Sequence, residues 1–307
     1  MNLREWALPV YTVLIELSSG ALFALWILRT LTGSRIDEKN LDEMTKIPIL
    51  IIFSTIIAAM AGAHLHLSRP YLSFLAVLNF QHSWLSREIT FNVFFFLLTG
   101  SLTALVWFVP EHYKLKQWLG WAAILAGFST IYCMAHIYLL PTQIAWNSTK
   151  TFLSYYAGML LLGSVSLITI LLMDLNFSFK NNQERSDFHV QFVRDAFIWL
   201  TRVTVMTSIM LMLLNAYQFD FLQRLQDPTA QTSLNLLLSI YLPLVILQIG
   251  FLLLGVIWLV LTLRRTMKEN GSIRKLLSPV YIANTLILIA AIIERFLFYA
   301  THVRIGI

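Results

Sequence analysis

The sequence predicts an all-α, polytopic membrane protein with eight transmembrane helices. Of its 307 residues, 58% are hydrophobic and 12% are charged, whereas a soluble domain carries roughly 25% charged residues. The mean hydropathy is +0.71. A soluble core could not hide this much apolar surface, because the outside of a soluble protein must be covered by polar groups. We therefore expect a single integral membrane domain over residues 1–307.

Eight apolar stretches have the length that a helix needs to cross hydrocarbon about 30 Å thick. Polar stretches separate them, among them the mixed-charge segment 33–46 and the hydrophilic connection 177–195. No soluble domain fits between two spans. The predicted spans are 6–31, 47–66, 88–109, 117–140, 151–174, 193–217, 234–263 and 275–299.

An even number of spans places both termini on one side of the membrane. The connections after the odd-numbered spans hold fourteen Lys and Arg residues, and the opposite side holds six. Cytoplasmic loops are enriched in these residues, so we expect both termini on the periplasmic side. The net charge of +6 then reflects topology, and we expect no nucleic-acid partner. The fourteen are Arg29, Arg35, Lys39, Lys46, Lys114, Lys116, Lys180, Arg185, Arg194, Arg264, Arg265, Lys268, Arg274 and Lys275, and the six are Arg4, Arg69, Arg87, Lys150, Arg224 and Arg304.

The connection between spans two and three carries the most informative polar residues. His66 ends span two and Glu88 begins span three, so a proton acceptor of neutral pH and a carboxylate lie at the same membrane depth. Oxidation of a quinol releases two protons with two electrons, and its hydroxyl groups need such acceptors. Structural interpretations remain open. Glu88 lies in the first turn of its helix, where a carboxylate stabilises the helix N-terminus by roughly 0.3–1 kcal/mol. His66 could equally be an interfacial histidine in the lipid headgroups, and Arg69 and Arg87 could anchor the chain at the level of the lipid phosphates.

Three segments give the chain a family resemblance. HLHLSRP at 64–70 and SWLSREI at 83–89 are similar to the His-Leu-Gly-x-Pro and Leu-Ser-x-Glu-Ile segments of the dimethyl sulfoxide reductase membrane-anchor subunit family, which is related to the polysulfide reductase anchors. RFLFYATH at 295–302 is similar to that family's Arg-x-x-Phe-Tyr-x-x-His ending. Ser68 replaces the family's usual glycine. Ala291 stands where the family has a carboxylate, and Glu294 lies beside Arg295 instead.

The resemblance implies a specific function. It implies an anchor that oxidises menaquinol in a bacterial inner membrane, carries no haem, and holds an iron–sulfur subunit and a molybdopterin catalytic subunit. The family's quinol-site histidine and glutamate fall on His66 and Glu88. We expect His64, Arg69, Arg87 and Trp84 to help bind quinol or a partner. The departures leave the terminal acceptor open between dimethyl sulfoxide, another S-oxide or N-oxide, and a sulfur oxyanion.

Ionisable residues inside the spans need a partner, because a charge in mid-membrane costs several kcal/mol. Glu16 lies about ten residues into span one and is a candidate proton relay, or a protonated glutamate that faces a neighbouring helix. Glu294 and Arg295 fall near the outer end of span eight, where we expect an interfacial structural role.

Two other functions remain as alternatives. A single cysteine, Cys133, excludes a four-cysteine iron–sulfur or zinc site, and we expect no metal in this chain. A haem-carrying cytochrome b-type anchor would need two histidines that face each other, whereas His66, His136 and His302 all fall at or beyond outer span ends. A secondary transporter would need symmetric broken helices and a midplane site, and Pro243 and Glu16 keep that alternative open.

Overall fold

The eight expected transmembrane helices are present in the computed structural model, which describes residues 3–33, 38–66, 70–109, 111–180, 187–269 and 276–303. Eight helices of the described part are long and apolar enough to cross a membrane, and that part contains no strand. These helices are α1 (Leu3–Thr32), α2 (Glu38–His66), α3 (Trp84–Phe108), α4 (Tyr113–Tyr138), α5 (Thr149–Lys180), α6 (Asp187–Arg224), α8 (Leu242–Glu269) and α9 (Leu277–Ala300).

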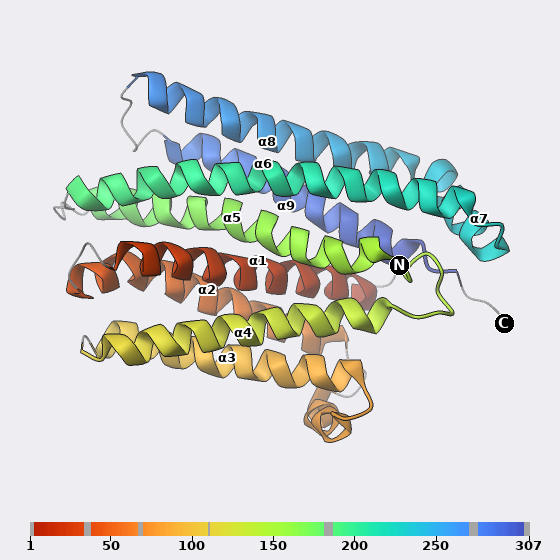
Figure 1. The fold of residues 1–307 in the computed structure, drawn as a ribbon, viewed down its shortest axis with the longest axis horizontal. Helices are drawn as coiled ribbons and strands as arrows, with labels where there is room; N and C mark the ends of the chain where they lie inside the picture. The colour runs from red at the N-terminus through yellow and green to blue at the C-terminus, as the bar shows by residue number, and fades with distance from the viewer. Residues whose placement is uncertain are drawn as a thin grey trace.

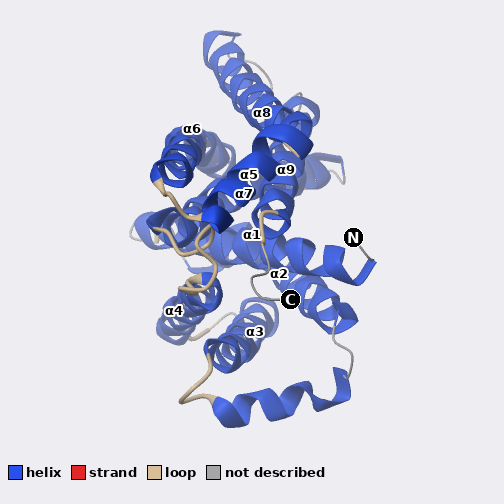
Figure 2. Cartoon of the chain, turned by 90° about the vertical axis from the view of Figure 1, so that its right-hand side faces the viewer, coloured by secondary structure: helices blue, strands red, loops and turns tan. Residues whose placement is uncertain are grey.

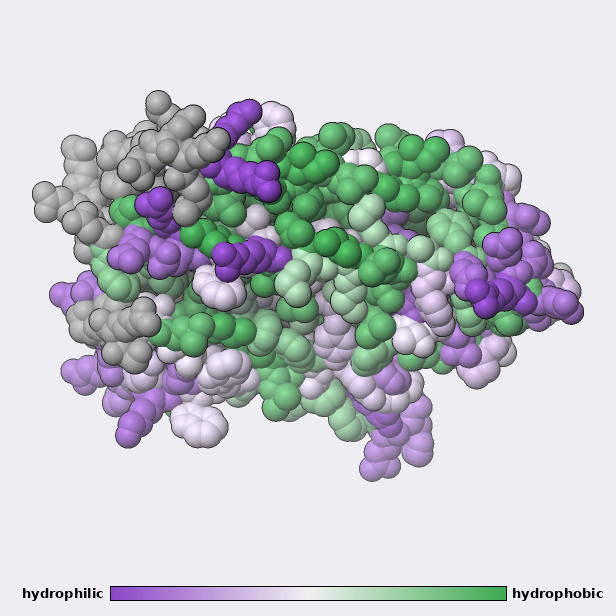
Figure 3. Space-filling view, turned by 45° about the horizontal axis from the view of Figure 1, so that its top comes forward, coloured by the Kyte–Doolittle hydropathy of each residue, from purple (hydrophilic) through white to green (hydrophobic). Residues whose placement is uncertain are grey.

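The long helices run side by side, with both chain termini toward the right-hand end of the view in Figure 1. We call this the terminal end of the bundle and the other the opposite end. Apolar side chains cover the middle of the molecule, and hydrophilic ones gather toward its two ends (Figure 3). This distribution is the one that a lipid bilayer requires of a spanning bundle.

Helix α5 lies at the centre of the bundle. In its most apolar window 83% of the residues are buried, against 28% in α2 and in α8. It packs closely on α1, where Gly20 meets Gly163: a Cβ at Gly20 would lie 1.9 Å from the Met159 carbonyl oxygen, and one at Gly163 would lie 2.2 Å from the Gly20 carbonyl carbon. Small residues allow such close approach of helix backbones in membranes.

A buried cluster of charges ties the opposite end together. Asp42 of α2 accepts a hydrogen bond of 2.5 Å from Arg29 Nη2 of α1 and another from Lys116 of α4. All three side chains are at most 5% exposed. Arg29 and Lys116, which the sequence analysis assigned to connections, are therefore helix residues whose charges offset Asp42.

The predicted start of the seventh span, residue 234, is wrong. The chain forms a short helix α7 (Pro228–Asn235) and a π-helical turn η2 (Leu236–Ile240), and α8 begins at Leu242. Asp227 caps α7, because its Oδ1 accepts the Thr229 hydroxyl and the backbone N–H groups of Thr229 (2.8 Å) and Ala230 (3.3 Å). These hydrogen bonds hold the pKa of Asp227 below its usual range. A hydropathy window of about 19 residues averages over a short helix and its capping residue, so it placed the start of the span too early.

A 3₁₀ helix, η1 (Pro70–Asn79), joins α2 to α3. It lies across the bundle as the lowest element in Figure 2. Its described side chains include exposed apolar ones, with Leu78 82% exposed. A segment of this kind suits the boundary between headgroups and acyl chains, and it leads directly into the predicted site.

Candidate functional site

The predicted carboxylate, Glu88, lies in a buried hydrogen-bonded cluster at the terminal end. Glu88 is 5% exposed and accepts a hydrogen bond from the hydroxyl of Tyr11 on α1. Asn92, one helical turn further along α3, donates from Nδ2 to the Tyr11 oxygen at 3.0 Å. Ser83 caps α3 by accepting from the Ser86 N–H at 3.3 Å. Tyr11 of α1 therefore holds the Glu88 carboxylate, and the N-terminus of α3 is capped by Ser83 and not by Glu88.

Asn92 leaves one acceptor of the cluster unused. Its Oδ1 is buried and has no hydrogen-bond partner among the described residues. A buried polar atom without a partner costs about 1–3 kcal/mol, and in a native structure such an atom calls for an explanation, a catalytic role among them. Glu88 and Asn92 thus offer two acceptors on the same face of α3, because residues four apart lie one above the other.

The terminal end of α2 lies beside this cluster. Tyr11 belongs to one buried apolar cluster with Ala59 of α2, Met134 and Ala135 of α4, and Tyr155 of α5. Two turns beyond Ala59, α2 ends at His66. The His66 side chain lies outside the described part, as does all of Arg69. The ring of His64 is exposed, and its Nδ1 lies 2.8 Å from the Met60 carbonyl oxygen.

Trp84 and Arg87 line an open groove between α3, α4 and α5. Arg87 donates to the carbonyl oxygens of Phe80 (2.9 Å) and Gln81 (2.6 Å), and its Cζ lies 4.3 Å from the centre of the Trp84 ring. The groove has a volume of about 390 Å³, within the range of small-molecule pockets. It is lined by Trp84, Arg87, Phe91, Leu125, Phe128, Ser129, Tyr132, Cys133 and Tyr156.

His136 belongs to this region, although the sequence analysis weighed it only as a haem ligand. Its ring packs against Tyr132 (4.1 Å between centroids) and Trp84 (4.5 Å). It lines a second open groove of about 520 Å³ that shares Tyr132 with the first. The structure therefore divides the predicted set: Glu88 points into the bundle, and Trp84 and Arg87 lie on an aromatic surface with His136.

The expected interfacial role of Arg295 is wrong. Arg295 is 1% exposed and forms an ion pair with Glu16 of α1. Its Nη2 also donates to the Ser154 carbonyl oxygen at 3.3 Å, and its Cζ lies 4.0 Å from the centre of the Tyr155 ring. Glu294 is likewise buried, at 6% exposed. The pairing between α1 and α9 is what permits burial at this depth, since an unpaired charge there would be costly.

The sequence analysis missed Tyr11, Asn92 and Tyr299. The Tyr299 hydroxyl lies 3.1 Å from Thr12 Oγ1, next to Tyr11 on α1. Asn92 gave a signal that could have been read, because it is a polar residue in an apolar span, four positions after Glu88. Tyr11 and Tyr299 gave none, since tyrosines near span ends are ordinary interfacial residues.

The sequence profile of a family described as DMSO reductase anchor subunit (DmsC) matches residues 1–301, nearly the whole chain. No curated protein matches the chain. The family match confirms the resemblance and identifies a multi-pass membrane anchor of DMSO reductase, an oxidoreductase complex. Within the described ranges, no group of three or more His, Cys, Asp or Glu residues could hold a metal ion.

Proposed function

We propose that this chain, which belongs to the DMSO reductase anchor subunit family, oxidises a quinol at the Glu88 cluster and passes the electrons to an iron–sulfur subunit. The observation that carries the proposal is the pair of buried acceptors, the Glu88 carboxylate and the unpartnered Asn92 Oδ1. A quinol hydroxyl is a donor, and it would satisfy an acceptor that the described residues leave unused.

The chemistry at this cluster is proton uptake coupled to electron loss. A quinol that becomes a quinone loses two electrons and two protons, and its two C–O single bonds become C=O bonds. Glu88 takes one proton from the bound hydroxyl, and we assign the other to His66, the last residue of α2. Tyr11 holds the Glu88 carboxylate in place through its hydroxyl. The two electrons leave to a cluster of the partner subunit.

The aromatic grooves give the quinol a way in from the lipid. They lie on the surface of the bundle at the terminal end, and seven of the fifteen residues that line them carry aromatic rings. Aromatic side chains bind flat rings by offset or edge-to-face packing. Trp84, Arg87 and His136 would guide the quinone ring, while its isoprenoid tail stays in lipid. Menaquinol is the quinol that the family resemblance implies.

The partners that we propose are those that the family resemblance implies. A chain with one cysteine cannot bind a four-cysteine cluster, which agrees with the iron–sulfur subunit that the resemblance implies as first electron acceptor. The resemblance likewise implies a molybdopterin subunit for the terminal reduction. Both would dock at the terminal end, where the quinol loses its electrons. We place the complex in a bacterial inner membrane with this end in the periplasm.

The test uses the assembled complex with Glu88→Gln and His66→Ala. Each substitution should lower quinol-dependent substrate reduction by about a hundredfold or more, in the range of a lost proton-transfer group. Artificial reductants that feed the peripheral subunits directly should still drive reduction at the wild-type rate. Glu43→Gln is the matched control, because Glu43 pairs with Lys46 at the opposite end, 2.5 Å away, and is 45% exposed.

Two results would contradict the proposal. Quinol-dependent turnover that survives both substitutions would show that the cluster does not handle the quinol protons. Loss of the peripheral subunits from both variants would show that these residues serve the fold or the subunit interface instead.

A further inference from the structure

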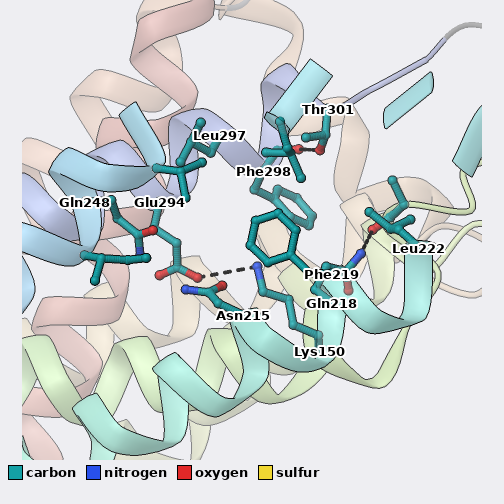
Figure 4. Close-up of a pocket in the computed structure, with 14 residues that line it drawn as sticks. Lys150, Asn215, Gln218, Phe219, Leu222, Gln248, Glu294, Leu297, Phe298 and Thr301 are labelled. Carbon is teal, nitrogen blue, oxygen red and sulfur yellow. Dashed lines mark hydrogen bonds and ion pairs between the residues drawn. The ribbon is translucent and has the colours of Figure 1, made fainter. Parts of the chain in front are cut away.

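A second polar cavity lies in the other half of the bundle, between α5, α6, α8 and α9 (Figure 4). It is lined by side chains of Lys150, Asn215, Gln218, Gln248 and Glu294, together with apolar residues. The cavity is separate from the aromatic grooves and shares no lining residue with them. Polar side chains of four helices converge there, which lipid-embedded packing alone does not require.

The size of the cavity decides what it can hold. Its volume is about 60 Å³, far below the roughly 300 Å³ at which small-molecule pockets begin. A quinone ring therefore does not fit. A buried water needs at least about 10–15 Å³ and two to four polar partners, so there is room for about four waters, and the lining side chains supply the partners.

Glu294 is the unsatisfied group of this cavity. Its Oε1 is buried and has no hydrogen-bond partner among the described residues. The nearest cation, Lys150 Nζ, lies 3.6 Å away, which is too long for a hydrogen bond. Figure 4 shows the two side chains reaching toward each other, with Asn215 beside the carboxylate. Gln218 is already engaged, since it accepts from Ser148 and donates to the Ala145 carbonyl oxygen, both at 2.8 Å.

A rare backbone feature borders the same cavity. Leu237, which lines it, lies in the π-helical turn Leu236–Ile240. The Tyr241 N–H donates to the Leu236 carbonyl oxygen at 2.9 Å, five residues back. Single π-helical turns are found frequently at functional sites. The turn and the unsatisfied carboxylate are independent observations that mark the same place.

We propose that this cavity is a hydrated proton-exchange site, in which Glu294 takes a proton from a hydronium ion to give a carboxylic acid and water, and later returns it. Lys150 is the counter-ion of the charged form. The other charged groups that face Glu294 are Glu16 from α1 and Arg295 from α9, while α6 and α8 contribute the amides of Asn215 and Gln248. Glu294 and Lys150 line the cavity, and the Glu16–Arg295 ion pair lies beside it, so these four groups can gain or lose one proton without leaving a large net charge.

Contacts connect this site to the Glu88 cluster, and here the inference rests on the proposed quinol oxidation. Arg295 lies beside Glu294 in the chain and over the Tyr155 ring. The Tyr155 and Tyr138 rings are stacked, with 6.2 Å between their centroids, and the centroids of the Tyr138 and Tyr299 rings are 5.5 Å apart. Tyr299 reaches Thr12, the neighbour of Tyr11. These contacts join the Glu88 cluster to the cavity through neighbouring side chains, among which the tyrosine and threonine hydroxyl groups are the ones able to pass a proton.

The experiment first tests for water in the wild-type complex. Hydroxyl radicals generated from bound water by brief X-ray exposure should label Phe219 and Phe298, which line the cavity. Val245→Phe should abolish this labelling, because the added ring fills the cavity. The substitution leaves the Lys150–Glu294 and Arg295–Glu16 ion pairs in place. Absence of labelling in the wild type would overturn the proposal, whatever the variants do.

The second measurement is turnover of the assembled complex. Glu294→Gln and Val245→Phe should each lower quinol-dependent turnover by about a hundredfold, the low end of the range for a positioned proton-transfer group. Glu294→Asp should retain part of the quinol-dependent turnover, because it keeps the carboxylate. The control Glu43→Gln should be indistinguishable from the wild type, and artificial reductants should drive every variant equally.

The two proposals fail in distinguishable ways. If Glu88→Gln abolishes quinol-dependent turnover while Glu294→Gln and Val245→Phe retain it, the cavity carries no proton and this inference is wrong. If Glu88→Gln retains turnover, the proposed function fails first. If Val245→Phe loses labelling together with turnover, and Glu294→Gln loses turnover, the exchange site is supported.

Discussion

Removal of the Glu16 carboxylate should destabilise the bundle more than any surface charge does. Glu16 and Arg295 are 1% and 2% exposed at their side chains, and loss of one partner from a buried pair costs about 3–5 kcal/mol. Arg295 would keep the Ser154 carbonyl oxygen at 3.3 Å and the Tyr155 ring. We therefore expect Glu16→Gln to lower the free energy of unfolding by about 3 kcal/mol, at the lower end of that range.

A double-mutant cycle isolates this interaction. Glu16→Gln, Arg295→Met and the double variant would be unfolded in mixed micelles of increasing SDS content and followed by helicity. The double variant should lose less free energy of unfolding than the two single variants lose in sum, because residues in direct contact are coupled by about 0.5–3 kcal/mol. Asp220→Asn is the control, since it breaks an exposed pair with Arg224 (79% and 54% exposed side chains) that contributes little.

The outcome also separates two roles for Glu16. If Glu16→Gln costs no more than Asp220→Asn, the ion pair does not support the fold and the reasoning above is refuted. If the role is structural, the assembled fraction of the variant should retain most quinol-dependent turnover, because the amide keeps the size and hydrogen bonding of the acid. Near-complete loss of turnover in an assembled complex would instead favour the proton relay that the sequence analysis considered.

Two further predictions concern packing and orientation. Gly163→Ala should destabilise the bundle, because the new Cβ would lie 2.2 Å from the Gly20 carbonyl carbon. Gly250→Ala is the control: a Cβ there would have no heavy atom within 4 Å, so the substitution should be neutral or stabilise α8 by up to about 1 kcal/mol. Equal effects of the two substitutions on SDS unfolding would contradict the close packing of α1 on α5. Reporter fusions and cysteine labelling in a Cys133→Ser background should place segments 33–46, 177–192 and 264–275 in the cytoplasm and both termini outside, and a cytoplasmic C-terminus would remove the argument for a periplasmic site.

The number of spans could be predicted from the sequence because lipid imposes a length of about 20 apolar residues on each helix. The ends of the spans could not. The polar segment 38–46 was expected to be a connection, yet α2 begins at Glu38, and its charge Asp42 is compensated by Arg29 and Lys116 from other helices. Such compensation depends on tertiary packing, which a hydropathy window does not contain.

The candidate site could be predicted only in part, for a related reason. Glu88 was found because it lies in a short motif near a span end. Its partner Tyr11 is 77 positions away, and the Glu16 partner Arg295 is 279 positions away. Which residues face each other across such distances depends on the rotation of each helix about its own axis. Since these spans are apolar on all sides, no amphipathic pattern in the sequence indicates that rotation.

The position of the site in the bundle links its chemistry to a compartment. Glu88, Tyr11, Asn92 and the Glu294 cavity all lie toward the terminal end, and Asp42 with its two cations lies at the opposite end. Under the proposed function, protons released at the terminal end would leave on that side, and a subunit that accepts the electrons would dock there, since electron tunnelling acts over short distances. One measurement, the side on which the C-terminus lies, therefore fixes both the compartment that receives the protons and the one that contains the peripheral subunits. A topology opposite to the expected one would move both together, without altering the roles proposed for Glu88 and Glu294.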